Sequence, residues 1–574
     1  MPEPSPPADA LAAAPIFAAL DAAQREDLAS HATRVRVRAG DWVFRQGEAP
    51  DALYVVLSGR LEVVVESPRR LLRVLGRGAA IGELALLTGS TRSASVRARR
   101  DSELLQLTAE RIETLLAEEP AFSLSLTRYL ATQLQASQSL DLAPSPRPET
   151  IGVLGLPAGP SARELSGVLA GLLAGGRVAV LTEAEAGTPE EYAGLLDRAE
   201  RDNDQVLLAA DSADGAEWRA FCLRQADRTL LVADGDPEAG TRRPEAEGRC
   251  DVLLAGRPPS GALGGWLDAL GVPAGRLIGP RADWERTLAP LARSLQGTSQ
   301  GLVLSGGGAR GFAHIGVAEV LLDAGVTFDR IAGVSMGALV GAQLAMGIAP
   351  AAIRERCQEE FVRANPMGDY TLPVVALVRG RRAEAMVRRI FGDALIEELP
   401  VEFMCTSCDL VTSTQEFHRR GPVLEAVGAS FCLPGIGPPV AMGDRLLVDG
   451  GVMNNLPVEP LAATGEGPVI ASDVTAMFEV PRRNQRVGGV AGRLRGAVLG
   501  RGIDVPLRIP EVIIRSIILG SSDTVAEGDA HADVVVRPSV STVPLTAFDQ
   551  IETLIDAGRE AARATLEAHP ELAA

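Results

Sequence analysis

The sequence GLVLSGGGARG at residues 301–311 and the sequence IAGVSMG at residues 331–337 decide the fold of the C-terminal part of this chain. Each begins with a short apolar run and continues into glycine, which predicts a buried strand that ends in a turn. Helices are expected directly after the two turns, at about 313–324 and 336–346. Strands that alternate with helices predict an α/β domain built on a parallel sheet.

The first turn, Gly306 to Gly311, has the composition of an anion-binding loop. Consecutive glycines let backbone N–H groups point at one place, and the N-terminus of the following helix favours negative charge there. Acyl transfer needs such donors for its tetrahedral oxyanion. A dinucleotide site also uses Gly-x-Gly-x-x-Gly, with an acidic residue near 20 positions further on. Asp329 is in range for that role, so this turn alone leaves both interpretations open.

The second turn places Ser335 between Gly333 and Gly337, in the Gly-x-Ser-x-Gly pattern of a nucleophile elbow. Glycine on both sides relieves the crowding of a tight strand-to-helix turn that presents a serine hydroxyl. The motif is a weak signal by itself in a glycine-rich chain. Its position after a strand, a glycine cradle and a helix makes Ser335 the candidate nucleophile.

Asp449 is the candidate base for Ser335. Residues 445–448 are expected to form a strand that delivers it to a turn, where Gly450 and Gly451 allow close approach of the backbone. An aspartate of ordinary pKa is a poor base for a hydroxyl. This interpretation therefore requires burial that raises the pKa of Asp449, or a site that orients it tightly.

A histidine base is the alternative. The chain has five histidines, and only His531 and His569 follow Asp449, as the order serine, acid, histidine requires. We expect His531 in a loop before a strand and His569 in the C-terminal tail. His314 comes directly after the glycine cradle, where a structural role at the start of the helix is expected.

With these three motifs, residues 300–560 resemble a patatin-like phospholipase domain, and within that family the neuropathy target esterase group of lysophospholipases. Ala429-Ser430 and Asn454-Asn455-Leu456-Pro457 are also similar to the family. The resemblance implies a three-layer α/β/α fold, esters of phospholipids or lysophospholipids as substrates, and a Ser-Asp dyad that needs no metal. It assigns the nucleophile to Ser335, the proton acceptor to Asp449, and the oxyanion hole to Gly306, Gly307, Gly308, Arg310 and Gly311.

The bulk composition narrows the class of function. A net charge of −18 disfavours nucleic-acid binding, and the absence of lysine excludes a P-loop lysine or a lysine Schiff base. Six scattered cysteines favour a reducing cytoplasm, and the N-terminus lacks the features of a signal peptide. The most apolar stretch, residues 331–348, contains the serine motif and four glycines, so it is interpreted as strand, turn and helix rather than as a membrane span.

The length of 574 residues predicts several domains. We expect a disordered N-terminus at 1–15, a first domain at 16–138, a proline-rich linker at 139–150, an α/β scaffold domain at 151–296 and the hydrolase domain at 300–565. Candidate strands of the scaffold domain are Ile151–Leu154, Arg177–Leu181, Gln205–Ala209, Thr229–Ala233 and Cys250–Leu254. The loop 155–161 of this domain lacks Gly-Lys-Ser/Thr, so no nucleotide chemistry is expected there.

The first domain is predicted to be a small antiparallel barrel or jelly roll, because glycines punctuate its short strands. Ser58-Gly59 lies between two β-rich runs and predicts a hairpin. A helix from Ala109 to Gln135 is expected to follow the strands.

The sequence Gly82-Glu83-Leu84-Ala85-Leu86, followed by Arg92-Ser93, suits a ligand with a ribose and one phosphate. With the preceding strands it resembles the cassette of a cyclic-nucleotide-binding domain. The resemblance assigns the ribose 2′-OH to Glu83 and the cyclic phosphate to Arg92 and Ser93, with cAMP or cGMP as the regulatory ligand. Gly82, Leu84 and Ala85 complete the binding cassette.

These predictions describe a cytoplasmic serine esterase, peripheral to the membrane, that hydrolyses (lyso)phospholipid esters under control of a cyclic nucleotide. Basic and apolar residues mix at 361–391 and 482–501, which are candidates for membrane contact. Cys405-x-x-Cys408 has no second ligand pair, so buried strand residues are expected there rather than zinc. The alternatives are an inactive, nucleotide-responsive scaffold that binds lipid or protein, and an esterase for soluble acyl compounds such as thioesters.

Overall fold

The computed structural model describes the chain except residues 1–10, 12–13, 18–19, 67–68, 120–121, 124, 128–147, 174, 190, 239, 245–248, 373, 476–512, 514, 517–518 and 574. The chain divides into two compact units, Met1–Gln296 and Gly297–Ala574. The expected proline-rich linker and the basic stretch 482–501 lie outside the described residues, except for the end of the linker.

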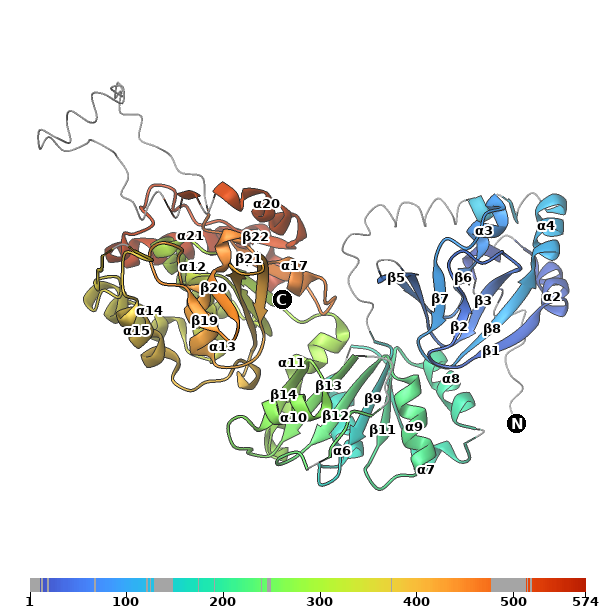
Figure 1. Ribbon diagram of the computed structural model, residues 1–574. Coiled ribbons are helices and arrows are strands. Elements are labelled where there is room, and N and C mark those ends of the chain that lie inside the picture. Colours follow the sequence, from blue (N-terminus) through green and yellow to red (C-terminus); the bar gives the residue numbers. More distant parts are fainter. Residues whose placement is uncertain are drawn as a thin grey trace, which may run out of the picture. The chain divides into compact units, whose positions relative to one another are not determined.

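The first part of unit 1 is a barrel of two four-stranded antiparallel sheets, ordered β1-β8-β3-β6 and β2-β7-β4-β5 (Figure 1). Alternate residues face its interior, where Val37, Phe44, Tyr54 and Val63 are buried. The strands are β1 Thr33–Val37, β2 Trp42–Phe44, β3 Ala52–Ser58, β4 Leu61–Glu66, β5 Arg69–Leu75, β6 Ala80–Ile81, β7 Ser95–Ala98 and β8 Ser102–Thr108.

The hairpin predicted at Ser58-Gly59 is wrong. β3 and β4 belong to different sheets, so the chain crosses from one sheet to the other at this corner instead of pairing with itself. Gly59 has φ 95°, and a Cβ on it would overlap Ser102 of β8. A glycine between two β-rich runs marks a barrel corner as readily as a hairpin turn, and the local sequence does not distinguish them.

The helix predicted from Ala109 to Gln135 is interrupted. Helix α4 covers Ala109–Glu118, and its C-cap residue Glu119 leaves the helical region with φ −121°. Helical residues resume at 122–123 and 125–127. Pro120 is the next residue, and the residue before a proline avoids helical geometry. Residues 128–135 lie outside the described part of the chain.

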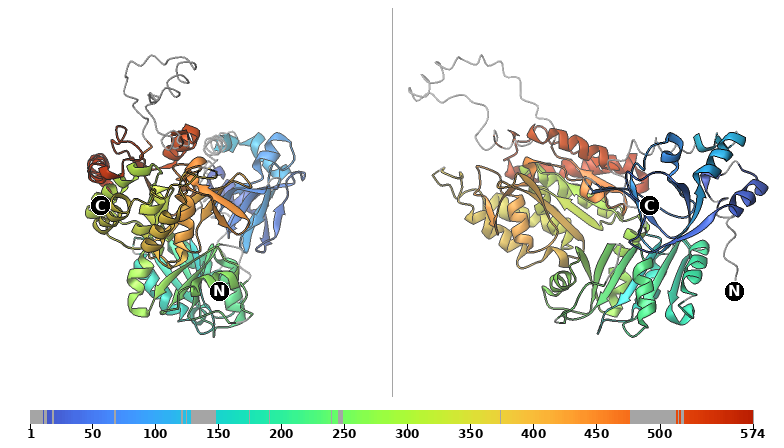
Figure 2. Two further views of the ribbon diagram at one scale, coloured as in Figure 1. Left: turned by 60° about the vertical axis from the view of Figure 1, so that its left-hand side comes forward. Right: turned by 45° about the vertical axis from the view of Figure 1, so that its right-hand side comes forward.

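The second part of unit 1 contains a six-stranded parallel sheet, ordered β10-β11-β9-β12-β13-β14. All five strands predicted here are confirmed, and β14 was missed because its sequence, AGRLIG, has no apolar run. Helices cover both faces of the sheet, with α6 and α11 on one and α8, α9 and α10 on the other (Figure 2). The elements are β9 Thr150–Gly155, α6 Ala162–Leu172, β10 Val178–Thr182, α8 Tyr192–Asp202, β11 Gln205–Ala210, α9 Ala216–Gln225, β12 Arg228–Ala233, β13 Arg249–Ala255, α10 Ala262–Leu270, β14 Ala274–Gly279 and α11 Trp284–Gln296.

The carboxylate of Asp211 lies at the N-terminus of helix α6. Asp211 accepts a hydrogen bond from the backbone N of Ala162 at 2.6 Å and from the hydroxyl of Ser161 at 3.2 Å. In a nucleotide-binding fold this helix end would face a phosphate. Here the Asp211 carboxylate supplies the negative charge that the helix N-terminus favours.

Unit 2 is built on one mixed sheet, ordered β19-β20-β17-β16-β15-β21-β22, with β18 paired to β17 (Figure 1). β15, β16, β17, β21 and β22 are parallel, and β18, β19 and β20 join antiparallel. The strands are β15 Gly301–Leu304, β16 Arg330–Gly333, β17 Glu402–Asp409, β18 Thr414–His418, β19 Val440–Met442, β20 Arg445–Asp449, β21 Val469–Ser472 and β22 Val534–Val536.

Both faces of this sheet are buried. On one face, Leu302 and Ile331 pack in a core with α12, α13, α15, α16 and α21. On the other, Val303 and Ala332 pack with the residues around α17 and α20. Strands buried on both sides explain the near-continuous apolar runs in the sequence. The helices are α12 Ala313–Asp323, α13 Met336–Ala345, α14 Pro350–Cys357, α15 Arg381–Phe391, α16 Val423–Ser430, α17 Glu459–Ala462, α20 Ser522–His531 and α21 Ile551–Ala568.

Helices α12 and α21 approach each other through two glycines. A Cβ on Gly558 would overlap the carbonyl of Ala313, and a Cβ on Gly316 would overlap the carbonyl of Ile555. We expect Gly558→Ala to destabilise unit 2 by about 1–3 kcal/mol, because displaced backbone costs more than the gain of about 1 kcal/mol from helix propensity. Calorimetric unfolding checks this.

The matched control is Gly167→Ala in α6, where nothing lies within 4 Å of an added Cβ. This variant is expected to keep or gain stability, by up to about 1 kcal/mol. Equal effects of the two substitutions would contradict the close helix contact.

Candidate active site

Ser335 lies on a strained turn between β16 and α13. Its backbone has φ 56° and ψ −124°, a region that non-glycine residues rarely adopt. A Cβ on Gly333 would overlap the backbone of Gly337, and a Cβ on Gly337 would overlap the carbonyls of Leu304 and Ser305. Both glycines of the motif are therefore required by space, and the turn holds the Ser335 side chain at the helix N-terminus.

The glycine cradle lies directly against this turn. A Cβ on Gly306 would be 3.2 Å from Cβ of Ser335, and one on Gly311 would overlap the side chain of Met336. Gly308 has φ 54°. Within the described part of the chain, the N–H groups of Gly307 and Gly308 donate to no acceptor, while that of Ala309 donates to the carbonyl of Leu545. Two free amide donors are thus available beside the serine.

Arg310 is buried and its side chain is held by other residues. The guanidinium donates to the carbonyls of Val543 at 2.8 Å and Ser541 at 2.7 Å. It therefore fastens the cradle to the segment 541–543.

Asp449 ends β20, paired with Ser407 of β17. Its carboxylate is buried, and Oδ1 accepts a hydrogen bond from the N of Gly451 at 2.8 Å. Burial raises the pKa of Asp449 to about 6, while contact with the Ser335 hydroxyl and the bond from Gly451 act to lower it. Oδ2 is buried and makes no hydrogen bond to a described residue. The Ser335 hydroxyl is nevertheless near enough to the carboxyl to lower its pKa.

Two further residues hold the Ser335 turn and the glycine cradle in place. The backbone N of Ser335 donates to the hydroxyl of Ser430 at 2.9 Å. The side-chain Nδ2 of Asn455 donates to the carbonyl of Gly306 at 3.1 Å. The backbone carbonyl of Asn455 accepts a hydrogen bond from the N of Gly306 at 3.3 Å. Both residues belong to sequences that resembled the family, but their contacts were not predicted.

The histidines take other roles. His314 is fully buried between the hydroxyl of Ser472, 2.8 Å from Nδ1, and the carbonyl of Ser305, 2.9 Å from Nε2. Burial lowers its pKa to about 4, so it is neutral and braces the cradle. His531 ends helix α20 rather than lying in the predicted loop. In the described part of the chain, no histidine has a hydrogen bond to Ser335 or Asp449.

Asp329 does not complete a dinucleotide site. It precedes β16, and its carboxylate accepts a hydrogen bond from the N of Gln300, which precedes β15. Parallel neighbours start at the same edge of a sheet, so Asp329 lies at the edge opposite the cradle. Cys405 and Cys408 are buried on β17, and their spacing directs them to opposite faces of the strand.

In unit 1, Gly82 with φ 86° starts helix α3, Glu83–Thr88. Glu83 is buried, which raises the pKa of its carboxyl. The guanidinium of Arg92 is buried and donates to the carbonyls of Gly82 and Ala52 and to the carboxylate of Asp51 at 2.8 Å. Its Nε is buried without an acceptor among the described residues, which fits a site for a phosphate. Ser93 and Leu84 are exposed, and Ala85 is buried.

Comparison with known proteins identifies both regions. The profile of the patatin-like phospholipase family matches residues 302–462, and that of the cyclic nucleotide-binding domain matches residues 34–119. NTE family proteins of Mycobacterium bovis and Mycobacterium tuberculosis are 36% identical over 582 aligned residues, which cover 98% of this chain and 97% of each relative. The chain belongs to the NTE family.

More distant NTE family relatives include the lysophospholipase nte1 of Aspergillus fumigatus. It is 28% identical over 77% of this chain, and the match spans 35% of its own length. Among solved structures, the catabolite activator protein of Thermus thermophilus is 32% identical over 22% of this chain and 61% of that chain, with a TM-score of 0.21. The NTE family protein described here thus combines a lipid ester hydrolase domain with a cyclic nucleotide-binding domain.

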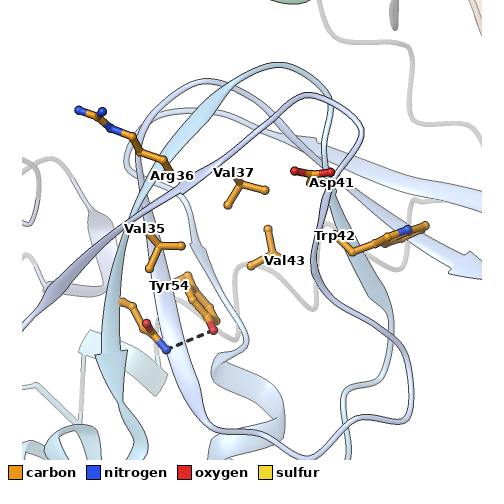
Figure 3. Close-up of a pocket in the computed structure, with 8 residues that line it drawn as sticks. Val35, Arg36, Val37, Asp41, Trp42, Val43 and Tyr54 are labelled. Atoms are coloured by element: carbon orange, nitrogen blue, oxygen red, sulfur yellow. Dashed lines mark hydrogen bonds between the residues drawn. The ribbon is translucent and has the colours of Figure 1, made fainter.

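The barrel of this NTE family protein also has a cavity of about 380 Å³ between the edge strands β1 and β2 (Figure 3). Tyr54, which lines it, accepts a hydrogen bond from Gln106 at 3.4 Å and donates to Asp51, the partner of Arg92, at 3.5 Å. The other lining residues are Val35, Arg36, Val37, Asp41, Trp42 and Val43.

No described helix of the protein is long and apolar enough to cross a membrane.

Proposed function

We propose that this NTE family protein hydrolyses the acyl ester of lysophospholipids or phospholipids, with Ser335 as nucleophile and Asp449 as general base. The observation that carries the proposal is the buried Asp449 carboxylate, whose pKa is raised to about 6 by burial and lowered by the nearby Ser335 hydroxyl. A general base whose pKa lies near the working pH is ionised in much of the enzyme and still has a high affinity for the proton it must accept.

In the proposed reaction, Ser335 Oγ attacks the acyl carbonyl carbon while Asp449 accepts the hydroxyl proton. The N–H groups of Gly307 and Gly308 donate to the oxyanion, and Gly306, Arg310 and Gly311 maintain the shape of the cradle. The ester C–O bond breaks, and the proton passes from Asp449 to the leaving alkoxide. Water then attacks the acyl-serine carbonyl while Asp449 accepts a proton from the water. The bond between the acyl carbon and Ser335 Oγ breaks, Asp449 returns the proton to Oγ, and the fatty acid leaves.

Two alternatives make different predictions. An inactive scaffold would not react with a fluorophosphonate, and an esterase for soluble acyl compounds would prefer a short-chain thioester to lysophosphatidylcholine. We expect covalent labelling and a higher kcat/KM on lysophosphatidylcholine. The free amides beside Ser335 support the active enzyme, because a binding scaffold does not need an oxyanion hole.

The pH dependence of kcat/KM tests the base. Asp449 acts only when ionised, so kcat/KM on a soluble ester is expected to fall about tenfold per pH unit below its pKa of about 6, and to be flat above it. A rate profile from pH 4.5 to 8 measures this. A histidine base would give a similar limb, so His531→Ala is the control and should leave the profile unchanged. A profile without a limb near pH 6, or one that His531→Ala removes, would overturn the assignment.

We propose that a cyclic nucleotide binds the first domain, with Arg92 and Ser93 on the cyclic phosphate and Glu83 on the ribose 2′-OH. Gly82, Leu84 and Ala85 form the start of the helix beside them. Binding is proposed to shift the helical region after β8 and thereby to alter access to Ser335. The phosphate must compete with Asp51 for Arg92, since the two are bonded in this structure.

Arg92→Gln is expected to weaken cAMP or cGMP binding by about 10- to 100-fold, because it removes charged hydrogen bonds to the phosphate. Isothermal titration with each nucleotide measures the loss. Arg97→Gln is the matched control, since Arg97 lies in the same barrel but pairs with Glu62. Equal affinities of Arg92→Gln and the wild type for the nucleotide would exclude this binding site. Lysophospholipase activity that is the same with and without saturating nucleotide would exclude the proposed regulation.

A further inference from the structure

A short segment of unit 2 exposes an unusual set of apolar side chains. Tyr370, Leu372, Val374 and Val375 are 73%, 83%, 89% and 67% exposed. Single exposed apolar residues are normal on a soluble protein, but four within six positions are not. Arg379, Arg381 and Arg382 follow within seven residues and are also exposed.

Backbone pairing makes this segment a hairpin. Tyr370 pairs with Val378, and the N of Thr371 donates to the carbonyl of Leu377 at 3.0 Å. The second arm of the hairpin is bonded in turn to residues 435–436, because the N of Leu377 donates to the carbonyl of Gly435 and the N of Val378 donates to that of Ile436. The apolar side chains are therefore presented to solvent by a fixed support.

The base of the hairpin is joined to the catalytic machinery. Val378, Ile436 and Leu545 form one buried cluster. The carbonyl of Leu545 accepts the N–H of Ala309 in the glycine cradle at 2.8 Å. On the other side, the segment that contains Ile436 starts at Cys432, whose carbonyl accepts the N–H of Asp449 at 2.8 Å. One packed support thus carries the hairpin, the glycine cradle and Asp449.

A basic surface continues from the hairpin along α15. Its inner face buries Met386, Val387, Ile390 and Phe391, so the arginines point outward. Arg381, Arg382 and Arg389 line a hollow of about 300 Å³. Arg389 is paired with Glu360, whereas Arg381 and Arg382 make no ion pair to any described residue. In a chain of net charge −18, this surface is locally basic, although Glu360 also lines the hollow.

We propose that the hairpin formed by residues 370–372 and 374–378 and the arginines at the start of α15 dock the enzyme on the surface of a lipid aggregate with anionic headgroups. Aliphatic and tyrosine side chains enter the interface, and Arg381 and Arg382 contact the phosphates. The proposal rests on the lipid hydrolase function, since it brings the support of Ser335 and Asp449 to the surface that contains the substrate. Charge complementarity selects lipid over an apolar protein partner.

The test is co-sedimentation of the full chain with phosphatidylcholine vesicles, with and without phosphatidylglycerol. Leu372→Glu/Val374→Glu is expected to lower the bound fraction on anionic vesicles by about tenfold or more. The matched control is Leu410→Glu/Val411→Glu, which adds the same charge at residues 51% and 66% exposed between β17 and β18. Arg381→Gln/Arg382→Gln should weaken binding only when phosphatidylglycerol is present.

Hydrolysis of a water-soluble short-chain ester provides the second readout, and all these variants should keep the wild-type rate. Vesicle binding by Leu372→Glu/Val374→Glu equal to that of the wild type would overturn the proposal, and so would an equal loss in the Leu410→Glu/Val411→Glu control. If wild-type protein binds vesicles through the hairpin but releases no fatty acid, the docking surface stands and the proposed lipid hydrolysis fails.

Discussion

Replacing Ser335 with alanine is expected to lower fatty acid release by about 10⁴-fold or more. The reason is covalent: without the hydroxyl there is no acyl-serine, and only the oxyanion donors and substrate binding remain. The backbone should tolerate the change, because alanine adds no atoms to the turn and the bond from the Ser335 N to Ser430 involves only the main chain of residue 335. Loss of activity should therefore come without loss of fold.

Fluorophosphonate labelling followed by peptide mapping separates this result from unfolding. Wild-type protein should carry one adduct, on the peptide that contains Ser335, and Ser335→Ala should carry none while its unfolding temperature stays unchanged. Ser407 is a useful internal control, because its hydroxyl contacts His418 at 2.7 Å but is fully buried. An adduct on Ser407 or elsewhere, with Ser335 unmodified, would contradict the assignment.

Replacing Asp449 with asparagine is expected to lower kcat by about 10²- to 10⁴-fold, the usual contribution of a general base. Asparagine keeps the size and can still accept the hydrogen bond from Gly451, but it cannot take the serine proton. The effect should appear in kcat rather than in KM, because Asp449 acts on the proton of Ser335 and not on bound substrate.

The same substitution is expected to stabilise the folded protein. The ordinary pKa of an aspartate is 3.8, and burial raises that of Asp449 to about 6. The folded state therefore holds this proton more tightly than the unfolded state, so ionisation costs stability as pH rises from 3.8 to 6, and the full cost remains above pH 6. That cost corresponds to about 3 kcal/mol at most. An asparagine side chain carries no charge, so calorimetry of Asp449→Asn at pH 7.5 should show a higher unfolding temperature.

At pH 4 this difference between Asp449→Asn and wild type should nearly vanish, because the carboxyl is then mostly protonated in the folded state. Such a pH-dependent gain links the stability change to the buried charge and not to better packing. A less stable Asp449→Asn at pH 7.5 would mean that the carboxylate is needed for folding, and the loss of activity would then say nothing about a base.

The sequence was sufficient for the elements that carry Ser335 and Asp449 because their signals are local. Gly333, Ser335 and Gly337 are close in the chain, and the apolar runs before them are buried on both faces of a sheet, so motif and strand reinforce each other. The prediction of a hairpin at Gly59 failed for the opposite reason. β3 and β4 pair with strands far along the chain, and the sequence around Gly59 does not indicate those partners.

The support of the site could not be derived from the sequence. Ser430 is 95 residues from Ser335, and Asn455 is 149 residues from Gly306. Arg310 was expected among the residues of the oxyanion hole, but nothing near it indicated that its guanidinium would bond to carbonyls more than 230 residues away. Single small polar residues on helix ends or turns give no local signal of a partner, so such contacts emerge only when the sheet is assembled.

The most direct test of the dyad on lipid is release of fatty acid from lysophosphatidylcholine by wild type, Ser335→Ala and Asp449→Asn in one assay. The expected result is turnover by the wild type and loss of turnover in both variants, with all three proteins folded. Full activity of Asp449→Asn would contradict the Ser-Asp dyad and return the role of base to a histidine. A folded wild-type protein that releases no fatty acid, with or without cyclic nucleotide, would contradict the lysophospholipase function itself.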